Sequence, residues 1–231
     1  MIRRLGLLAV AVLVAGCAAA PSRVDPLEPM NRALFEVNDV AETFVIKPVV
    51  TVYTTVVPSI VRTGISNAFG NIEDLFSAVN GLLQGKPDKA GNDLGRVMVN
   101  TMFGLGGLID IASDAGIERG NEDFGQTFGV WGFGQGPYLF VPFFGPTTIR
   151  DGSGFLVRLA VGPVGFIPDV PVRNSLYGVG YVDLQTQAMD ARAVVDTAAL
   201  DRYRFIRNAY LQKRRYDVHD GKLPPEKEED E

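Results

Sequence analysis

Apolar residues recur along most of the chain at the spacing of an amphipathic helix. In LEPMNRALFEVNDVAETFVI, residues 27–46, they return every three or four positions, with charged and amide side chains on the opposite side. This spacing predicts a helix that Pro48 interrupts. Similar patterns predict further helices over residues 59–70, 72–83, 88–103, 147–162, 175–200 and 200–216.

Glycine and asparagine are expected to divide two of these helices. Gly70 is expected to stop the helix that follows Pro58, and Asn71 to cap the next one, because its side chain accepts from free N–H groups of a first turn. Glu73 and Asp74 then fall where the helix dipole favours negative charge. The pattern therefore predicts two short helices here.

Two segments lack the helical pattern. The β-branched run VVTVYTTVV, residues 49–57, is typical of a strand, and the glycine-rich residues 104–116 indicate a loop with a short helical turn. Helical patterns nevertheless dominate. We therefore expect an all-α fold, a single domain of many short amphipathic helices over residues 27–217.

One long stretch is apolar and uncharged but has a broken backbone. The sequence FGQTFGVWGFGQGPYLFVPFFGP, residues 124–146, contains eight aromatic residues, six glycines and three prolines. Glycines permit tight turns and close approach of elements, whereas three prolines exclude a regular spanning helix. The stretch is either a wall that meets lipid or a tightly packed turn region of a water-soluble core.

The N-terminus has the pattern of a bacterial lipoprotein signal. Arg3 and Arg4 precede a short apolar run, and small residues then lead to Cys17. We expect residues 1–16 to be a signal peptide, Cys17 to carry lipid, and residues 17–26 to form a tether. The alternative is an ordinary signal peptide cut at Ala18–Ala20, with an incidental thiol at Cys17.

The C-terminus is acidic and poor in apolar residues. Residues 218–231 cannot bury enough surface to offset their ordering entropy, so we expect a disordered acidic tail, with a partner-binding arm as the alternative. The whole chain has a net charge of −5, and no basic patch dominates it. Nucleic acid is therefore not an expected partner.

The chain lacks the usual combinations of catalytic and metal-binding side chains. His219 is the only histidine and Cys17 the only cysteine, so neither a nucleophile–base pair nor a transition-metal site is indicated. We expect no catalytic residues, no metal and no cofactor. An acidic cluster is interpreted as a solvated loop face, with calcium binding as the alternative; its members are Asp110, Asp114, Glu118, Glu122 and Asp123.

Five blocks of the sequence, in order, resemble the MlaA (VacJ) family of outer-membrane lipoproteins. The most specific block is DFGQTFGVWGFGQGPYLFVPFFGPTTIRD, residues 123–151. One departure is Arg202, which stands where the family pattern leads us to expect a proline. The other matching blocks are residues 25–39, 67–86, 95–113 and 200–214.

The resemblance implies a fold and a function. Members of this family form a membrane-embedded ring of helices around an amphipathic channel, held in the outer membrane from its periplasmic side. They remove mislocalised phospholipids from the outer leaflet and pass them to a periplasmic lipid-carrier protein, which maintains lipid asymmetry. They associate with trimeric porins and perform no covalent chemistry.

The resemblance turns the aromatic stretch into a set of candidate site residues. Rings with a polar atom suit the headgroup level, and phenylalanine rings suit greater depth. Arg150 either holds a headgroup phosphate or pairs with Asp151 or Asp123. The candidates facing the lipid channel or the membrane are Trp131, Phe133, Tyr138, Phe140, Phe143, Phe144 and Arg150.

Two other classes of function compete with transport. A soluble, lipid-anchored envelope scaffold would share the anchor but have no lipid path. An esterase or phospholipase would need a base near its nucleophile, and the chain offers no histidine for that role apart from His219.

The anchor and the folded body are separable by one substitution. We expect Cys17→Ser to leave the protein membrane-bound and dependent on detergent for extraction, because an embedded ring holds itself in lipid without the acyl chains. Fractionation of membranes by sedimentation, with and without detergent, checks this. Release of the variant into the soluble fraction would favour the scaffold.

Overall fold

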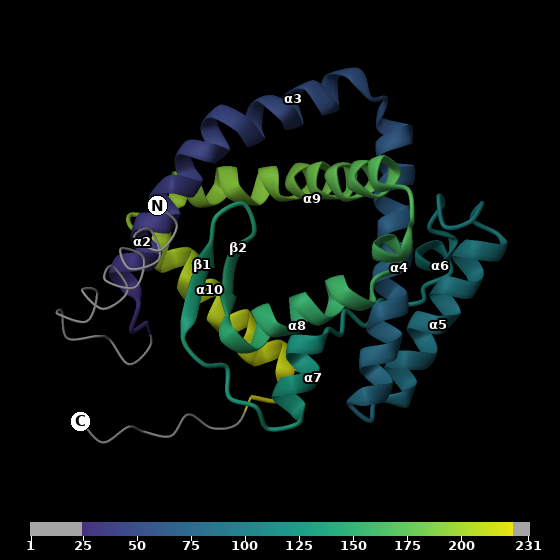
Figure 1. Ribbon diagram of the computed structural model, residues 1–231. Coiled ribbons are helices and arrows are strands. Elements are labelled where there is room, and N and C mark those ends of the chain that lie inside the picture. The colour runs from purple at the N-terminus through teal and green to yellow at the C-terminus, as the bar shows by residue number, and fades with distance from the viewer. Residues whose placement is uncertain (1–24, 224–231) are drawn as a thin grey trace.

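The computed structural model describes residues 25–223, and its helices form an open ring (Figure 1). The expected all-α, single-domain class is confirmed, apart from one small hairpin. The signal peptide, Cys17, most of the tether and the end of the acidic tail lie outside the described residues. The first elements are α2 (Glu28–Ala41), the π-helix η2 (Glu42–Ile46), α3 (Lys47–Val56) and α4 (Ser59–Leu83).

The strand predicted for residues 49–57 is wrong, because this segment belongs to helix α3. The helix also runs through Pro48. This residue lies in the first turn of α3, where its missing N–H costs no hydrogen bond within that helix. The wider turn of η2 precedes it, and the backbone N–H of Lys47 bonds to the carbonyl of Glu42, five residues back. Local β propensity is thus overridden by a continuous helical arm.

The two short helices predicted on either side of Gly70 are one helix, α4. Gly70 is buried against a neighbour, because a Cβ there would lie 3.1 Å from an Nη atom of Arg119. Asn71 caps nothing; its side chain donates to Thr101 on the next helix, 3.1 Å away. The glycine is therefore a contact site rather than a helix stop.

The middle of the chain supplies one side of the ring and a hairpin. The uncharged stretch of residues 124–146 divides into α7, a loop and the antiparallel pair β1–β2, in which Tyr138 faces Thr148. Asn31 of α2 extends this ladder, because its side chain donates to the Tyr138 carbonyl and accepts from the Phe140 N–H, both at 3.0 Å. The elements are α5 (Pro87–Met102), α6 (Ile111–Asp114), α7 (Phe124–Val130), β1 (Tyr138–Val141), β2 (Gly145–Thr148) and α8 (Ile149–Val161).

The last elements close the ring. The 3-10 helix η3 (Pro163–Phe166) leads into α9 (Val170–Ala198), which packs against α3 and α4, and then into α10 (Arg202–Val218). Helix α10 begins at Arg202, with Asp201 accepting from the N–H of Arg204 at 3.0 Å, so the departure from the family pattern does not disrupt the helix start.

Arg214 joins α10 to α7 and α8. Its guanidinium lies 2.6 Å from Asp123 and 3.0 Å from Asp151. Burial opposes ionisation of both carboxyls, but the hydrogen bonds and charge of Arg214 outweigh it and keep the pKa of each below its usual value. A Cβ at Gly125 would lie 2.7 Å from an Nη atom of Arg214, so only glycine permits this approach.

The apolar core is small and lies where α2, the hairpin and α10 meet. Phe35 and Tyr203 pack edge to face at a centroid distance of 5.8 Å, and Phe140 packs on Phe35 at 5.2 Å. Tyr138 completes this buried cluster. The core therefore fixes the hairpin to α2 and α10.

The interface between α4 and α5 is polar instead. Arg96, almost fully buried, lies 2.9 Å from both Asp74 and Asp110. Burial raises the pKa of the Asp110 carboxyl, but hydrogen bonds from Ser113, Asn100 and Arg96 outweigh it and hold the pKa to about 2. Charge-assisted hydrogen bonds thus replace apolar packing between the two helices.

Removing the cation of this interface should be costly. We expect Arg96→Met to lower the free energy of unfolding by about 3–5 kcal/mol, because it removes the buried partner of Asp74 and leaves that carboxylate with only the partly exposed Arg119, 2.6 Å away. Denaturant unfolding in detergent, followed by circular dichroism, measures this.

The matched control is Arg204→Met, which removes an exposed pair and should cost about 1 kcal/mol or less. Equal losses for the two variants would show that the buried network does not carry the stability assigned to it.

Candidate functional site

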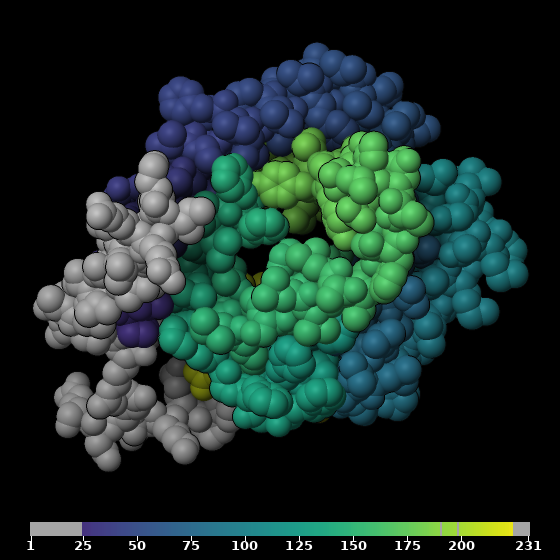
Figure 2. All heavy atoms as spheres, in the orientation of Figure 1, coloured from purple at the N-terminus to yellow at the C-terminus, as the bar shows by residue number. Residues whose placement is uncertain are grey.

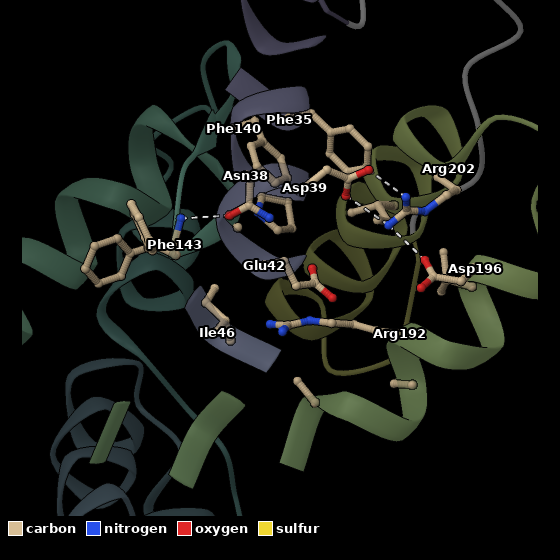
Figure 3. Close-up of a pocket in the computed structure, with 17 residues that line it drawn as sticks. Phe35, Asn38, Asp39, Glu42, Ile46, Phe140, Phe143, Arg192, Asp196 and Arg202 are labelled. Carbon is tan, nitrogen blue, oxygen red and sulfur yellow. Dashed lines mark hydrogen bonds and ion pairs between the residues drawn. The ribbon is translucent and has the colours of Figure 1, made fainter. Parts of the chain in front are cut away.

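The centre of the ring is hollow. Figure 2 shows an opening bordered by the teal hairpin and by green α8 and α9. A pocket of about 240 Å³ shares the hairpin and α9 with this hollow. It is lined by Phe35, Asn38, Asp39, Glu42, Ile46, Phe140, Phe143, Phe144, Gly145, Pro146, Ala188, Ala191, Arg192, Val195, Asp196, Arg202 and Ile206 (Figure 3).

One side of the pocket carries a closed set of ion pairs. Arg202, the first residue of α10, binds Asp39 of α2 through two hydrogen bonds of 2.7 and 3.0 Å. The same guanidinium lies 2.8 Å from Asp196 of α9. Arg202 thus links α2, α9 and α10 at the pocket wall, where one guanidinium faces the two carboxylates of Asp39 and Asp196.

The other charged groups face each other across the pocket. Figure 3 shows the carboxylate of Glu42 and the guanidinium of Arg192 directed toward one another, with no ion pair between them. Arg192 donates instead to the amide oxygen of Gln185, and Glu42 lies 3.6 Å from Lys47. The pocket thus presents one anion and one cation that no ion pair joins.

The tip of the hairpin is fixed in the wall of the pocket. The N–H of Phe143 donates to Asn38 at 2.8 Å, and its carbonyl accepts from Tyr181 at 2.9 Å and Gln185 at 3.2 Å. Phe143 has a φ of 70°, which a non-glycine residue seldom adopts. Three helical side chains therefore hold a strained turn in place between α2 and α9.

The surface of the arm formed by η2, α3 and the start of α4 has the opposite character. Large apolar side chains are exposed along the arm of η2, α3 and the start of α4, including Phe44 at 74 % and Ile60 at 81 %. Such continuous exposure is typical of a surface that meets lipid or another protein. The rest of this set is Val45, Val49, Val52, Val56 and Val61.

Among residues 25–223 we find no single helix that is long and apolar enough to span a membrane. One bent pair, residues 28–56 and 59–83, satisfies the requirement in length and composition when its two arms, inclined at 117°, are taken together.

The structure divides the predicted site residues into three groups. Phe140, Phe143 and Phe144 line the pocket, although Phe140 is only 3 % exposed and belongs to the core as well. Tyr138 is 1 % exposed and packs against Tyr203, so the prediction that it lies at a headgroup level is wrong. The alternation of strand β1 directs it into the core.

Trp131, Phe133 and Arg150 lie away from the first pocket. Trp131 is exposed, and its indole N–H donates to the Leu83 carbonyl at 3.0 Å. Arg150 and Phe133 line a second pocket of about 260 Å³ beside α10. Arg150 lies 2.9 Å from Asp151, which is one of the two pairings considered from the sequence.

The five acidic residues do not share one solvated face, although Asp114 and Glu118 are exposed as that interpretation predicts. Asp110 pairs with Arg96, Glu122 is buried against Lys86 and Lys89, and Asp123 binds Arg214. No group of side chains suited to a metal ion occurs in the part of the chain that the structure describes. These carboxylates serve separate interhelical ion pairs.

Sequence analysis missed the charged residues of the pocket. Asp39, Glu42, Arg192, Asp196 and Arg202 occupy the polar sides of helices, which a pattern alone assigns to solvent. Arg202 alone among them stood out in the sequence, because it departs from the proline expected at that position.

Comparisons with known proteins agree with one another. The family model described as MlaA lipoprotein matches residues 23–217. The "Intermembrane phospholipid transport system lipoprotein MlaA" of Escherichia coli (strain K12) is 32% identical over 227 residues, covering 93% of this chain and 88% of the relative. The protein of the same name from Haemophilus influenzae is 32% identical over 228 residues, with coverage of 94% and 91%.

A solved structure described as "Structural basis for maintenance of bacterial outer membrane lipid asymmetry" has the same architecture. It superposes with a TM-score of 0.74 at 31% identity, covering 85% of this chain and 100% of the other. Together with the match of the family model, this similarity shows that the chain belongs to the MlaA lipoprotein family.

Proposed function

We propose that this protein removes mislocalised phospholipids from the outer leaflet of the outer membrane and passes them to a carrier in the periplasm. The observation that carries the proposal is a ring with apolar side chains on its arms and a hollow, partly charged centre. A phospholipid needs both environments at once, one for its acyl tails and one for its headgroup.

The physical chemistry of the surface supports an embedded position. In hydrocarbon, backbone groups need internal partners, and helices provide them. The bent arm from Glu28 to Leu83 presents apolar side chains on such helices, while Asp39 and Glu42 lie in the pocket and Asp74 lies in a buried pair. The ring therefore sits in the periplasmic leaflet, held additionally by lipid on Cys17.

The competing functions explain less of the structure. A scaffold needs neither a hollow centre nor an exposed apolar arm, and a phospholipase needs a nucleophile beside a base. Transport also accounts for the similarity to lipoproteins named for intermembrane phospholipid transport. A trimeric porin and a periplasmic lipid-carrier protein are the partners that family membership implies.

The apolar arm offers a test of embedding. In the Cys17→Ser background, Phe44→Asp with Val52→Asp should weaken binding to phospholipid vesicles, because each carboxylate in hydrocarbon costs about 2.5–3.5 kcal/mol. Co-sedimentation with vesicles measures the change.

The control is Leu223→Asp, which places the same charge on an exposed residue beyond α10. Unchanged vesicle binding by the double variant would contradict embedding through this arm.

Passage through the hollow is tested by filling it. Ala191→Trp adds a large ring to the pocket wall, so cells carrying it should accumulate phospholipid on their surface, as cells without the protein should. Labelling of intact cells with a membrane-impermeant amine reagent, and growth in detergent with chelator, measure this.

Ala193→Trp is the matched control, because Ala193 is exposed on the same helix and does not line the pocket. If Ala191→Trp protein reached the membrane in normal amount and kept the outer leaflet free of phospholipid, passage through this hollow would be refuted.

A further inference from the structure

The pocket contains two opposite charges that do not pair with each other. Arg202 satisfies Asp39 and Asp196 together, at 2.7 and 2.8 Å. Glu42 and Arg192 remain, and no ion pair joins them although they are directed toward each other (Figure 3). The carboxylate and the guanidinium line one small pocket without pairing. A zwitterionic ligand, which has both a positive and a negative group, would bind to both.

Each of the two groups now has a weak partner, and a ligand would make a stronger interaction with it. Arg192 donates to the neutral amide oxygen of Gln185, and exchange for a phosphate oxygen gives a charge-assisted hydrogen bond, which is about twice as strong. Glu42 is nearly buried, and its cation Lys47 is 3.6 Å away and half exposed to solvent. A buried carboxylate with so distant a partner retains capacity for another donor.

We propose that Arg192 and Glu42 form a headgroup site for a zwitterionic phospholipid with a primary amine, such as phosphatidylethanolamine. This inference rests on the proposed transport function and adds a substrate class to it. The phosphate binds the planar fork of Arg192, and the ammonium donates to the carboxylate of Glu42. The acyl chains leave the site past Ile46 and Phe144.

The size of the pocket agrees with a headgroup. Its volume of about 240 Å³ is on the scale of a headgroup rather than of a whole lipid with two acyl chains. The hollow of the ring and the surrounding bilayer accommodate the tails.

The charges also discriminate between headgroups. An anionic phosphatidylglycerol supplies a phosphate for Arg192 but leaves Glu42 facing an uncharged glycerol. A trimethylated choline carries the positive charge but has no N–H to donate to the carboxylate. A primary ammonium satisfies both the charge and the hydrogen bond of Glu42.

Lipid capture by the purified, full-length lipoprotein tests the site. The protein is mixed with vesicles containing equal amounts of phosphatidylethanolamine, phosphatidylglycerol and phosphatidylcholine, re-isolated, and its bound lipid quantified by mass spectrometry. We expect phosphatidylethanolamine to exceed each other lipid about tenfold, the effect of one charged hydrogen bond.

The variants separate the two halves of the site. Glu42→Gln should lower phosphatidylethanolamine capture and bring the ratio to phosphatidylglycerol near one. Arg192→Gln should lower capture of all three lipids, and Arg192→Lys should restore part of it. Glu36→Gln on the exposed face of α2 and Arg204→Gln on exposed α10 are the matched controls and should change nothing.

Each remaining outcome decides the question. Equal capture of the three lipids by the unaltered protein, or an undiminished preference in Glu42→Gln, overturns the headgroup site and leaves transport intact. Displacement of bound lipid by inorganic phosphate at the same concentration as the lipid also overturns it, since the site would then bind a free anion. If the unaltered protein captured no phospholipid at all, the proposed function would fail with it.

Discussion

Charge-assisted hydrogen bonds between helices hold this ring open. Arg214 joins α10 to α7 and α8, and Arg96 joins α4 to the segment around Asp110. A solid apolar core would draw the helices together and close the centre, whereas directional ion pairs fix them at their edges. The small aromatic cluster around Phe35 only attaches the hairpin. The hollow therefore depends on buried arginines.

This mode of stabilisation suits the membrane-embedded position that we propose for the ring. Exposed side chains of the α3 arm gain nothing from burial if they already meet hydrocarbon, so apolar packing is not available to drive folding there. Buried polar pairs between α4 and α5, such as Arg96 with Asp74 and Ser77 with Asp93, specify how the helices meet. The same distribution leaves charged groups in the wall of the pocket.

The pocket combines fixed ion pairs with two opposite charges, which is the basis of the proposed headgroup site. Its ion pairs around Arg202 set the geometry, the hairpin tip at Phe143 closes one wall, and Glu42 and Arg192 supply opposite charges for a bound group. These residues come from α2, η2, β1–β2, α9 and α10, so the pocket forms only when these elements are assembled.

The sequence by itself determined the helical class, most helix positions and the family, because amphipathic spacing and ordered motifs are local properties. It misassigned residues 49–57 and Gly70, where contacts with other elements outweigh local propensity. Only the tertiary structure decided that Tyr138 is buried and that Arg192 faces Glu42. Hydrophobic periodicity reports which side of a helix is polar, but whether that side meets solvent or an enclosed pocket depends on helices far apart in the chain.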